Sequence, residues 1–450
     1  MYTRDHRTAD LRAIARLGGP LLANNLAITG MTLADTVMAG QVGAVQLAGL
    51  AVGAAYWHLF LFIGFGMLMA VSPTVAHANG ADDRIAAVGY VRQSWWLALA
   101  LAVVLVSGLR QVDWVLPAIR IDADILPTSI GYVHAITWGM PGALAFFSLR
   151  YTSEGLGRTK PIMYIGLVAL ALNVFGNWVF IYGKFGMPAL GAIGCGVATA
   201  IVFWFMFVAM FLHMRRHRAY RPFEFFASIA RPHGRTLREL ARIGAPIAGS
   251  ILAEGGLFVA AALIMGSMGA ITAGAHQIAL NYASFMFMVP LAVSSATTIH
   301  VGHTLGRGDR ARARSIGLLG ISICAVVMFT SALGIVVLND GIAALYTRDP
   351  PVRELAATLL LMAALFQLSD GIQVGAAGAL RGFKDTAVPL VFCVFSYWVV
   401  GFSLAYYFGV VRQGGPIYVW IGLIVGLSLS AVLLVSRFLA VSRKRLTVDG

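Results

Sequence analysis

Charged residues are scarce in this sequence of 450 residues: they make up 12% of it, against 59% hydrophobic residues. Soluble domains carry about 25% charged residues and roughly half apolar ones. The deficit excludes an ordinary soluble domain and indicates a chain that lies mostly within a lipid bilayer. Only three cysteines occur, each in an apolar run, so neither a disulfide framework nor a cysteine metal site is expected.

Several catalytic and ligand-binding signatures are also missing. The sequence contains no GxxxxGK[ST] phosphate-binding loop, no HExxH and no Cys/His cluster. We therefore expect no ATP-driven step, no cofactor, no resident metal and no enzymatic activity. The net charge is +14, but the basic residues fall between long apolar stretches, so nucleic acid is not an expected partner.

Long apolar runs recur along the whole chain. About 20 apolar residues are needed to cross a bilayer as a helix. The hydropathy pattern predicts twelve such spans, near residues 14–38, 47–76, 94–117, 128–153, 161–182, 189–213, 240–267, 275–302, 316–338, 355–379, 388–410 and 416–440.

The basic residues predict the orientation of these spans. If both termini are cytoplasmic, 27 of the 33 Lys and Arg residues fall in cytoplasmic segments and the other six in outer loops. Cytoplasmic loops of membrane proteins carry such an excess of positive charge. We therefore expect a multi-pass membrane protein with both ends in the cytoplasm.

The chain also repeats itself at a constant offset. "LRAIARLGGP" begins at Leu11 and "LRELARIGAP" begins at Leu237, 226 residues later. The same offset relates further identical residues, namely Gly40 and Gly266, Gly43 and Gly269, His77 and His303, Gly80 and Gly306, and Asp83-Arg84 and Asp309-Arg310. Agreement at one offset indicates an internal duplication of six spans.

An even number of spans returns the chain to its starting side, so both repeats insert in the same orientation. The predicted fold is therefore an all-α integral membrane protein with two six-helix bundles related by a pseudo-two-fold axis along the membrane normal. The predicted domains are residues 1–213, a basic cytoplasmic linker at 214–238, and residues 239–450. Two such bundles suit transport by alternating access.

Three acidic residues interrupt the apolar pattern. Asp35, in "MTLADTVMAG", Glu254 and Asp370 are the acids predicted to lie well inside spans. Ionisable groups at membrane depth cost roughly 2.5–3.5 kcal/mol each on insertion scales and are usually functional. When the two repeats are aligned at the offset of 226, each of the three acids aligns with an apolar residue. Each repeat therefore has its own polar groups.

Amide side chains accompany Asp35 in the first repeat. Asn24 precedes it by about three helical turns, on the same face. Asn173 and Asn177 lie one turn apart in the fifth span. A carboxylate with two amide oxygens suits a proton or a hard monovalent cation, which prefers oxygen ligands.

The second repeat offers a similar set. Ser250 precedes Glu254 by one turn, and Gln367 and Gln373 flank Asp370 at three residues each. Burial raises the pKa of an acid and a bound cation lowers it, so a coupling ion and an organic cation can compete for one negative charge. The structural alternative is that these polar groups only tie helices together.

One span combines amides with Met and aromatic residues. Gln277 and Asn281 lie one turn apart in the eighth span, followed by Phe285 and Met286 in "FMFMVP". Met and aromatic surfaces adapt to varied ligands. We take these four residues as candidates for substrate binding, with ordinary helix packing as the alternative.

Taken together, these stretches resemble the multidrug and toxic compound extrusion (MATE) family, in its NorM-like branch. The resemblance covers residues 10–440. It rests on Pro20 followed by "ADTVMAG", on "GRTKP" at Gly157, on Glu254 in "ILAEGG", and on Asp370 in "QLSDGIQVGAAGALRGFKDT". It implies a secondary-active exporter of cationic, amphipathic drugs and dyes, driven by inward Na⁺ or H⁺.

The functional positions that the resemblance implies are Asp35, Asn173 and Asn177 in the first bundle, with Glu254 and Asp370 in the second. One position departs from some relatives, which carry a second acid where this chain has Asn177. The pair Glu254 and Asp370 matches the NorM-like pattern, in which sodium is a common coupling ion. The same carboxylates can hold either ion, so the choice stays open.

Other functions remain as alternatives. An exporter or flippase of a lipid-linked or metabolite substrate would share the bundle architecture, but anionic cargo would call for basic residues inside the spans. An intramembrane enzyme would need a nucleophile and base at one depth. A passive channel would show a repeated pore motif. The acid-bearing spans favour an exporter of small organic cations.

Overall fold

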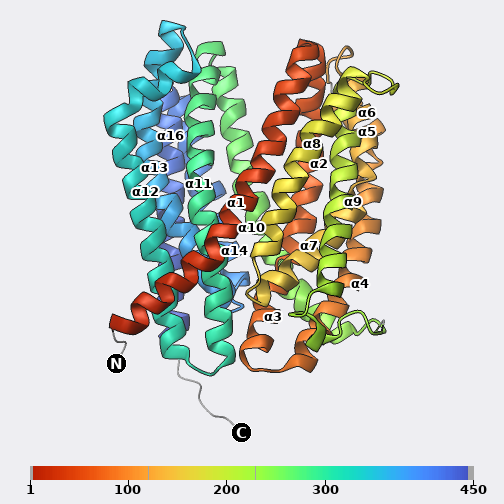
Figure 1. Ribbon diagram of the computed structural model, residues 1–450. Coiled ribbons are helices and arrows are strands. Elements are labelled where there is room, and N and C mark those ends of the chain that lie inside the picture. The colour runs from red at the N-terminus through yellow and green to blue at the C-terminus, as the bar shows by residue number, and fades with distance from the viewer. Residues whose placement is uncertain (1–3, 120, 229, 444–450) are drawn as a thin grey trace. The chain divides into compact units, whose positions relative to one another are not determined.

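The protein is almost entirely helical in the computed structural model, which describes residues 4–119, 121–228 and 230–443 (Figure 1). No strand occurs among these residues. Arg120, Lys444 and Arg445, three of the basic residues counted above, lie outside them. The predicted all-α fold is confirmed.

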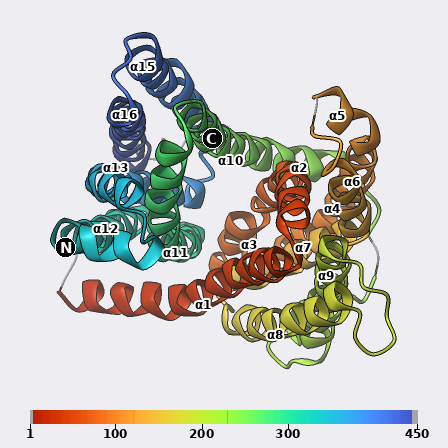
Figure 2. The same ribbon diagram turned by 90° about the horizontal axis from the view of Figure 1, so that it is seen from above.

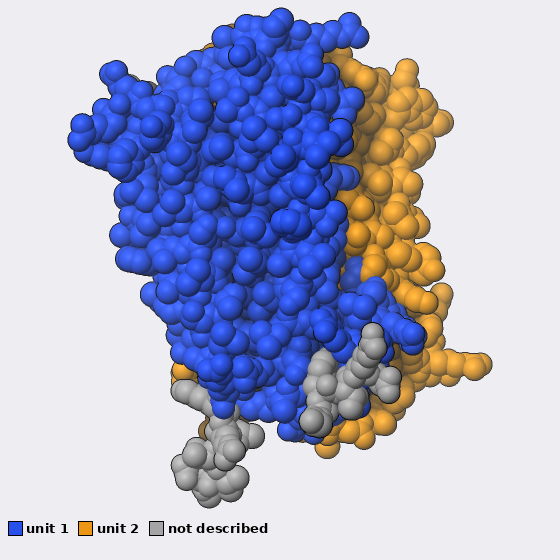
Figure 3. All heavy atoms as spheres, turned by 90° about the vertical axis from the view of Figure 1, so that its left-hand side faces the viewer, with its two compact units in different colours: residues 1–18, 249–450 blue, residues 19–248 orange. Residues whose placement is uncertain are grey.

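Residues 19–248 form one compact unit, called unit 2 and coloured orange in Figure 3. α8 and α9 lie side by side in it (Figures 1 and 2). Its elements are most of α1 (Arg4–Val42), then α2 (Ala44–Leu68), α3 (Val71–Gly80), α4 (Arg84–Leu109), α5 (Val112–Ala118), α6 (Leu126–Thr137), α7 (Met140–Gly155), α8 (Lys160–Tyr182), α9 (Ala192–Arg216), the 3₁₀ turn Arg221–Phe223 and the start of α10 (Gly234–Ser267).

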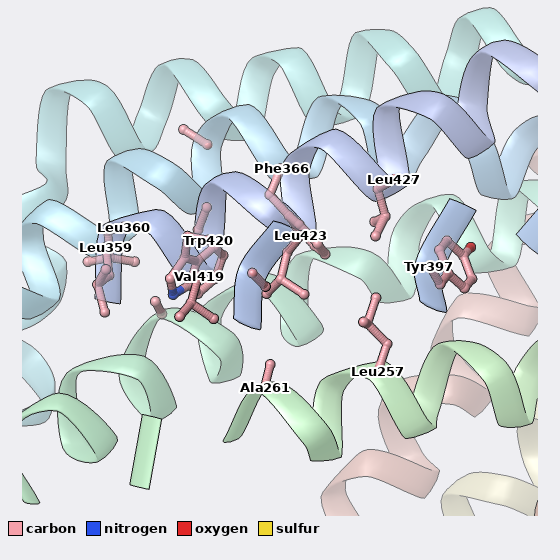
Figure 4. Packing of buried hydrophobic residues seen from close by; sticks show 14 of the residues in the cluster. Leu257, Ala261, Leu359, Leu360, Phe366, Tyr397, Val419, Trp420, Leu423 and Leu427 are labelled. Carbon is pink, nitrogen blue, oxygen red and sulfur yellow. The ribbon is translucent and has the colours of Figure 1, made fainter. Parts of the chain in front are cut away.

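Residues 1–18 and 249–450 form the other compact unit, called unit 1. Its core is built from buried aliphatic and aromatic side chains, among them Leu257, Phe366, Trp420 and Leu423 (Figure 4). Its elements are the start of α1, most of α10, then α11 (Ala270–Gly306), α12 (Arg310–Tyr346), α13 (Pro350–Gly382), α14 (Ala387–Val394), a π-helix (Phe395–Phe402), α15 (Ser403–Tyr406), a second π-helix (Tyr407–Val411) and α16 (Pro416–Arg443).

The twelve predicted spans correspond to these elements. Among the described residues, ten stretches of helix are long and apolar enough to cross a membrane, and α1 and the pair α6 and α7 supply the other two. Two of the spans are interrupted. The fourth span is broken at Trp138-Gly139, shortly before Pro141, and the second bends at Met69-Ala70, shortly before Pro73. Proline cannot donate the helical hydrogen bond, which favours a break one turn earlier.

The internal duplication is visible in the local structure. α2 begins at Ala44 and α11 at Ala270, and both follow a glycine with positive φ. α4 and α12 begin 226 residues apart, and each is capped in the same way: the carboxylates of Asp83 and Asp309 accept a backbone N–H three residues on, both at 2.9 Å. A side-chain oxygen at this position satisfies one of the free N–H groups of a helix start.

The start of each repeat belongs to the unit that holds the rest of the other repeat. Residues 4–18 of α1 pack in unit 1, where Ile14 lies in a core cluster and Asp10 accepts from Arg312 at 2.8 Å. Residues 234–248 of α10 pack in unit 2, where Tyr90 donates to Glu239 at 3.0 Å. The predicted domains, residues 1–213 and 239–450 with a linker at 214–238, stay a prediction.

The predicted linker is an ordered part of unit 2. α10 begins at Gly234, inside the predicted linker, and the segment before it is fixed by side chains of α4. Arg92 donates to the carbonyl oxygen of Glu224 at 2.9 Å, and Trp96 to that of Ala230 at 2.8 Å. The Tyr220 hydroxyl lies 2.7 Å from the Ser153 hydroxyl, and burial raises the pKa of Tyr220.

Candidate functional site

The first candidate site lies in unit 2, where α1, α8 and α9 bring polar side chains together. Asp35 is half-buried on α1, while Asn173 and Asn177 are fully buried on α8. Their spacing of four residues places both amides on one face of α8. The structure therefore joins the three residues that the sequence predicted would act together.

The carboxylate of Asp35 is surrounded by hydrogen-bond donors. Its Oδ1 accepts from the amide of Asn177 at 2.6 Å and from that of Asn173 at 3.2 Å. Its Oδ2 accepts from the Thr199 hydroxyl at 3.4 Å, and its backbone oxygen lies 3.7 Å from the Cys195 sulfur. No Lys, Arg or His pairs with Asp35 among the described residues, so its carboxylate is surrounded by neutral dipoles and by no positive charge.

The amide groups beside Asp35 can reorient when an ion binds. The Oδ1 atom of Asn177 has no hydrogen-bond partner among the described residues. An amide presents either N–H groups or an oxygen, so the two asparagines can donate to the carboxylate alone or turn their oxygens towards a cation. These oxygens fit a small hard cation or a proton.

The sequence analysis did not find Thr199 or Cys195. Both come from α9, and neither residue type stands out in an apolar span, because buried threonines usually bond to their own helix and buried cysteines are ordinary core residues. Their only signal is their spacing of four residues, which places them on one face of α9.

The second candidate site lies in unit 1, between α10 and α13. The amide of Gln373 donates to Oε1 of Glu254 at 3.4 Å, and Asp370 lies one turn earlier on α13, in electrostatic reach of Glu254. Asp370 and Gln373 are almost fully buried. Oδ1 of Asp370 and Oε1 of Gln373 have no hydrogen-bond partner among the described residues. Unpaired oxygens beside two acids form a set of ligands suited to a cation.

Three other residues predicted around these sites contact side chains other than the three acids. The oxygen of Gln367 accepts from Ser331 of α12 at 2.8 Å, and Ser250 interacts with Cys393. Asn24 does not reach Asp35. When the Asn24 amide is oriented so that both its nitrogen and its oxygen have a hydrogen-bond partner, the oxygen accepts from Arg150 at 3.2 Å. Asn24 and Asp35 lie on the same face of α1, but Asn24 bonds to Arg150 of α7 and not to Asp35.

A buried ion pair lies at the end of α7. The side chains of Arg150 and Glu154 are only 8% and 3% exposed, and Arg150 Nε lies 2.8 Å from Glu154 Oε1. The spacing of four residues between opposite charges was the available signal. Because the arginine is paired, it leaves no free positive charge for an anionic substrate.

The ion pair between Arg150 and Glu154 is expected to contribute to the stability of the fold. Glu154→Ala leaves Arg150 buried without its carboxylate, so the free energy of unfolding should fall by about 3 kcal/mol, the lower end for a broken buried pair. Denaturant titration in detergent, followed by tryptophan fluorescence, measures the change. The double variant Arg150→Met/Glu154→Leu should recover most of the loss. A double variant as unstable as Glu154→Ala would contradict an electrostatic origin.

The predicted substrate residues form a stripe on α11. Gln277 donates to Asn281 at 3.0 Å, and Phe285 is 55% exposed one turn further along. Met286 beside it is half-buried. The stripe is accessible on unit 1, and its role in substrate binding stays a prediction.

Helices of span length in two units, each of which holds acidic and amide side chains within its spans, are typical of a membrane transport protein. The MatE family model matches residues 20–179 and again residues 246–407, so its two matched segments start 226 residues apart. The chain belongs to the MATE family.

Relatives agree with this assignment. The chain is 39% identical over 433 residues to the multidrug resistance protein MdtK of Yersinia pseudotuberculosis serotype O:1b, covering 95% of each chain. MdtK of Yersinia enterocolitica serotype O:8 is also 39% identical over 433 residues. The eukaryotic MATE transporter AtDTX14 shares the fold with a TM-score of 0.88 at 18% identity, covering 97% of this chain and 98% of that one. An outward-facing multidrug resistance MATE transporter has a TM-score of 0.87, also at 18% identity, covering 96% of each chain.

Proposed function

We propose that the protein is a secondary-active multidrug efflux transporter that exchanges organic cations and dyes for inward Na⁺ or H⁺. The observation that carries the proposal is the Asp35 carboxylate, held inside a span by neutral donors and with no basic partner among the described residues. Such a charge has to be balanced by something that arrives from outside the protein. The MdtK relatives are named multidrug resistance proteins, and we take drugs as the substrate class from that name.

The mechanism follows from competition for negative charge. When the coupling ion occupies a carboxylate, the site is neutral and an organic cation has no electrostatic reason to remain. When the ion leaves, the exposed charge attracts the organic cation again. Alternating access converts this competition into transport, provided the ion is released on the cytoplasmic side and bound on the outer side.

Both units are proposed to bind cations, each with a different set of polar residues. Unit 2 contributes Asp35 with Asn173 and Asn177, and unit 1 contributes Glu254 and Asp370. The exposed α11 stripe, beginning at Gln277, is proposed to contact the substrate. Because Arg150 is paired with Glu154, it offers no free positive charge to anionic lipid-linked cargo.

The proposed setting is the bacterial inner membrane, with a monomer spanning it and both termini in the cytoplasm. The basic residues supply the orientation, and the docked segment around Tyr220 is then cytoplasmic. Single cysteines introduced at exposed Asp82 and at exposed Asp124, in a variant lacking Cys195, Cys324 and Cys393, test it. In inside-out vesicles an impermeant maleimide should label the first position and not the second.

Dye efflux from proteoliposomes tests the function itself. Purified protein is reconstituted with ethidium inside, and an inward Na⁺ gradient, an inward H⁺ gradient or no gradient is imposed. Efflux should require one of the two gradients and should stop when an ionophore dissipates it. Equal efflux with and without gradients would reject secondary-active exchange, and no efflux of any organic cation would reject the substrate class.

A further inference from the structure

One end of unit 2 carries basic side chains from two separate segments. α8 begins at Lys160 and α9 ends at Arg216, and the two helices pack against each other after a short connection at 183–191. A short connection makes neighbouring helices antiparallel, so the start of α8 lies at the same end as the close of α9. Arg158, in the "GRTKP" stretch, is half-buried, and the others are exposed. We call this group the basic surface of unit 2: Arg158, Lys160, Arg215, Arg216 and Arg218.

The segment that follows α9 is packed onto unit 2 by its aromatic residues. Tyr220 is 2% exposed, and the guanidinium carbon of Arg158 lies 4.6 Å from the centre of its ring. The same carbon lies 6.0 Å from the centre of the Phe223 ring. Phe226 stacks on Trp95 of α4, with ring centres 5.3 Å apart. The aromatic rings therefore fix this segment in place, while its arginines stay exposed.

The protein supplies little negative charge to the basic surface. Residues 214–238 contain seven arginines and one acid, Glu224. None of the five side chains of the basic surface forms an ion pair among the described residues.

Two enclosed nitrogen atoms beside the basic surface also lack a partner. Nη1 of Arg158 and Nε2 of His213 have no hydrogen-bond partner among the described residues. The His213 ring packs edge-on against the Tyr220 ring, with centres 5.8 Å apart, and Arg158 lies over that same ring. Native proteins rarely leave an enclosed guanidinium N–H without an acceptor, so this surface is suited to an anion that supplies one.

We infer that the basic surface binds the phosphate headgroups of anionic phospholipids. The apolar run of the sixth span ends near residue 213, so Arg215, Arg216 and Arg218 follow it within less than two helical turns. This places them at the depth of the lipid headgroups, which flank the hydrocarbon core. Guanidinium groups bind phosphate oxygens through paired N–H groups, and basic clusters directly beyond a span are typical of anionic-lipid binding.

The alternative is that these charges only orient the protein in the membrane. An orienting charge has no preference for one headgroup once the protein is inserted, and removing it acts like removing equal charge elsewhere on the same side. A binding surface loses lipid affinity only when its own residues change. The basic surface holds none of the three buried acids, so the inference does not depend on the proposed ion exchange.

Lipid binding to the purified full-length protein tests the inference. Delipidated protein in detergent is titrated with phosphatidylglycerol or with phosphatidylcholine of the same acyl chains, and native mass spectrometry gives the Kd of the first lipid bound. We expect phosphatidylglycerol to bind about tenfold more tightly or better. Arg215→Gln/Arg216→Gln/Arg218→Gln should raise its Kd by about tenfold or more, because each arginine near an anionic membrane contributes roughly fivefold. The Kd of phosphatidylcholine should stay unchanged.

The matched control is Arg7→Gln/Arg12→Gln/Arg16→Gln, which removes the same charge from three exposed arginines at the start of α1. Its Kd for phosphatidylglycerol should stay within about threefold of the wild type. An equal loss of affinity in both triple variants would overturn the inference in favour of general charge attraction. An unchanged Kd in the triple variant of the basic surface would overturn it as well.

Two further measurements identify the source of the phosphate and guard against misfolding. Glycerol phosphate, the free headgroup, should displace phosphatidylglycerol only in large excess, and displacement at equal concentration would assign the surface to a soluble phosphate instead. Without lipid, the melting temperatures of the wild type and the basic-surface variant should agree within about 2 °C, because the changed side chains are exposed. Added phosphatidylglycerol should then raise the melting temperature of the wild type more than that of the variant.

Discussion

Asp35→Asn is expected to reduce gradient-driven dye efflux by about a hundredfold, because a fixed amide cannot exchange charge with an ion or a substrate. Asparagine keeps the size of the side chain and can still bond to Asn173 and Asn177, so helix packing should survive. The initial rate of ethidium efflux from proteoliposomes measures the effect. A melting temperature near that of the parent would show that the loss is functional.

The matched control for this variant is Asp124→Asn, which removes the same charge from an exposed loop of the same unit. Its efflux should equal that of the wild type under either gradient. Efflux by Asp35→Asn at half the wild-type rate or more would make Asp35 a group that only ties α1 to α8. The search for the coupling group would then move to unit 1.

Glu254→Gln is expected to produce a second large loss, of about tenfold or more in the driven efflux rate. The glutamine can still meet Gln373, but it removes one of the two charges that attract a cation to this site. Asp370 is the remaining acid, and with Asp370→Asn added the response of unit 1 to Na⁺ should disappear. The double variant should therefore be more defective than Glu254→Gln alone.

Glu354→Gln is the control here, because Glu354 is exposed at the start of α13, the helix that also carries Asp370. Na⁺-driven and H⁺-driven efflux should be measured separately for each variant. Wild-type efflux in the double variant under both gradients would show that unit 2 couples transport without help from unit 1.

Hydropathy and the duplication predicted most of the architecture. Apolar runs of span length recur because the bilayer demands them, and "LRAIARLGGP" and "LRELARIGAP" show the repeat directly. The interruptions were harder to predict. The π-turns at Phe395–Phe402 depend on how neighbouring helices pack, and the residues of that span are as apolar there as elsewhere. The break at Trp138-Gly139 differs, because Pro141 marks it in the sequence.

Some of the site residues could be predicted from the sequence, and others depend on contacts between helices. Asp35, Glu254 and Asp370 were predictable because a carboxylate is expensive in an apolar span, and the spacing of Asn173 and Asn177 placed both on one face. Thr199 was missed because threonine is common in helices and usually bonds to its own backbone. Asn24 was misplaced because sharing a face with Asp35 does not decide which of two neighbouring helices supplies the partner.

The central claim is that these buried carboxylates couple cation entry to export, and simultaneous flux measurement tests it most directly. Ethidium efflux and uptake of ²²Na⁺ or protons are recorded in the same proteoliposomes, with ethidium supplied or withheld. We predict that ethidium accelerates uptake of one of the two ions, and that Asp35→Asn abolishes this acceleration together with efflux. Ethidium export without accelerated ion uptake, or coupled fluxes unchanged in Asp35→Asn and Glu254→Gln, would contradict the account.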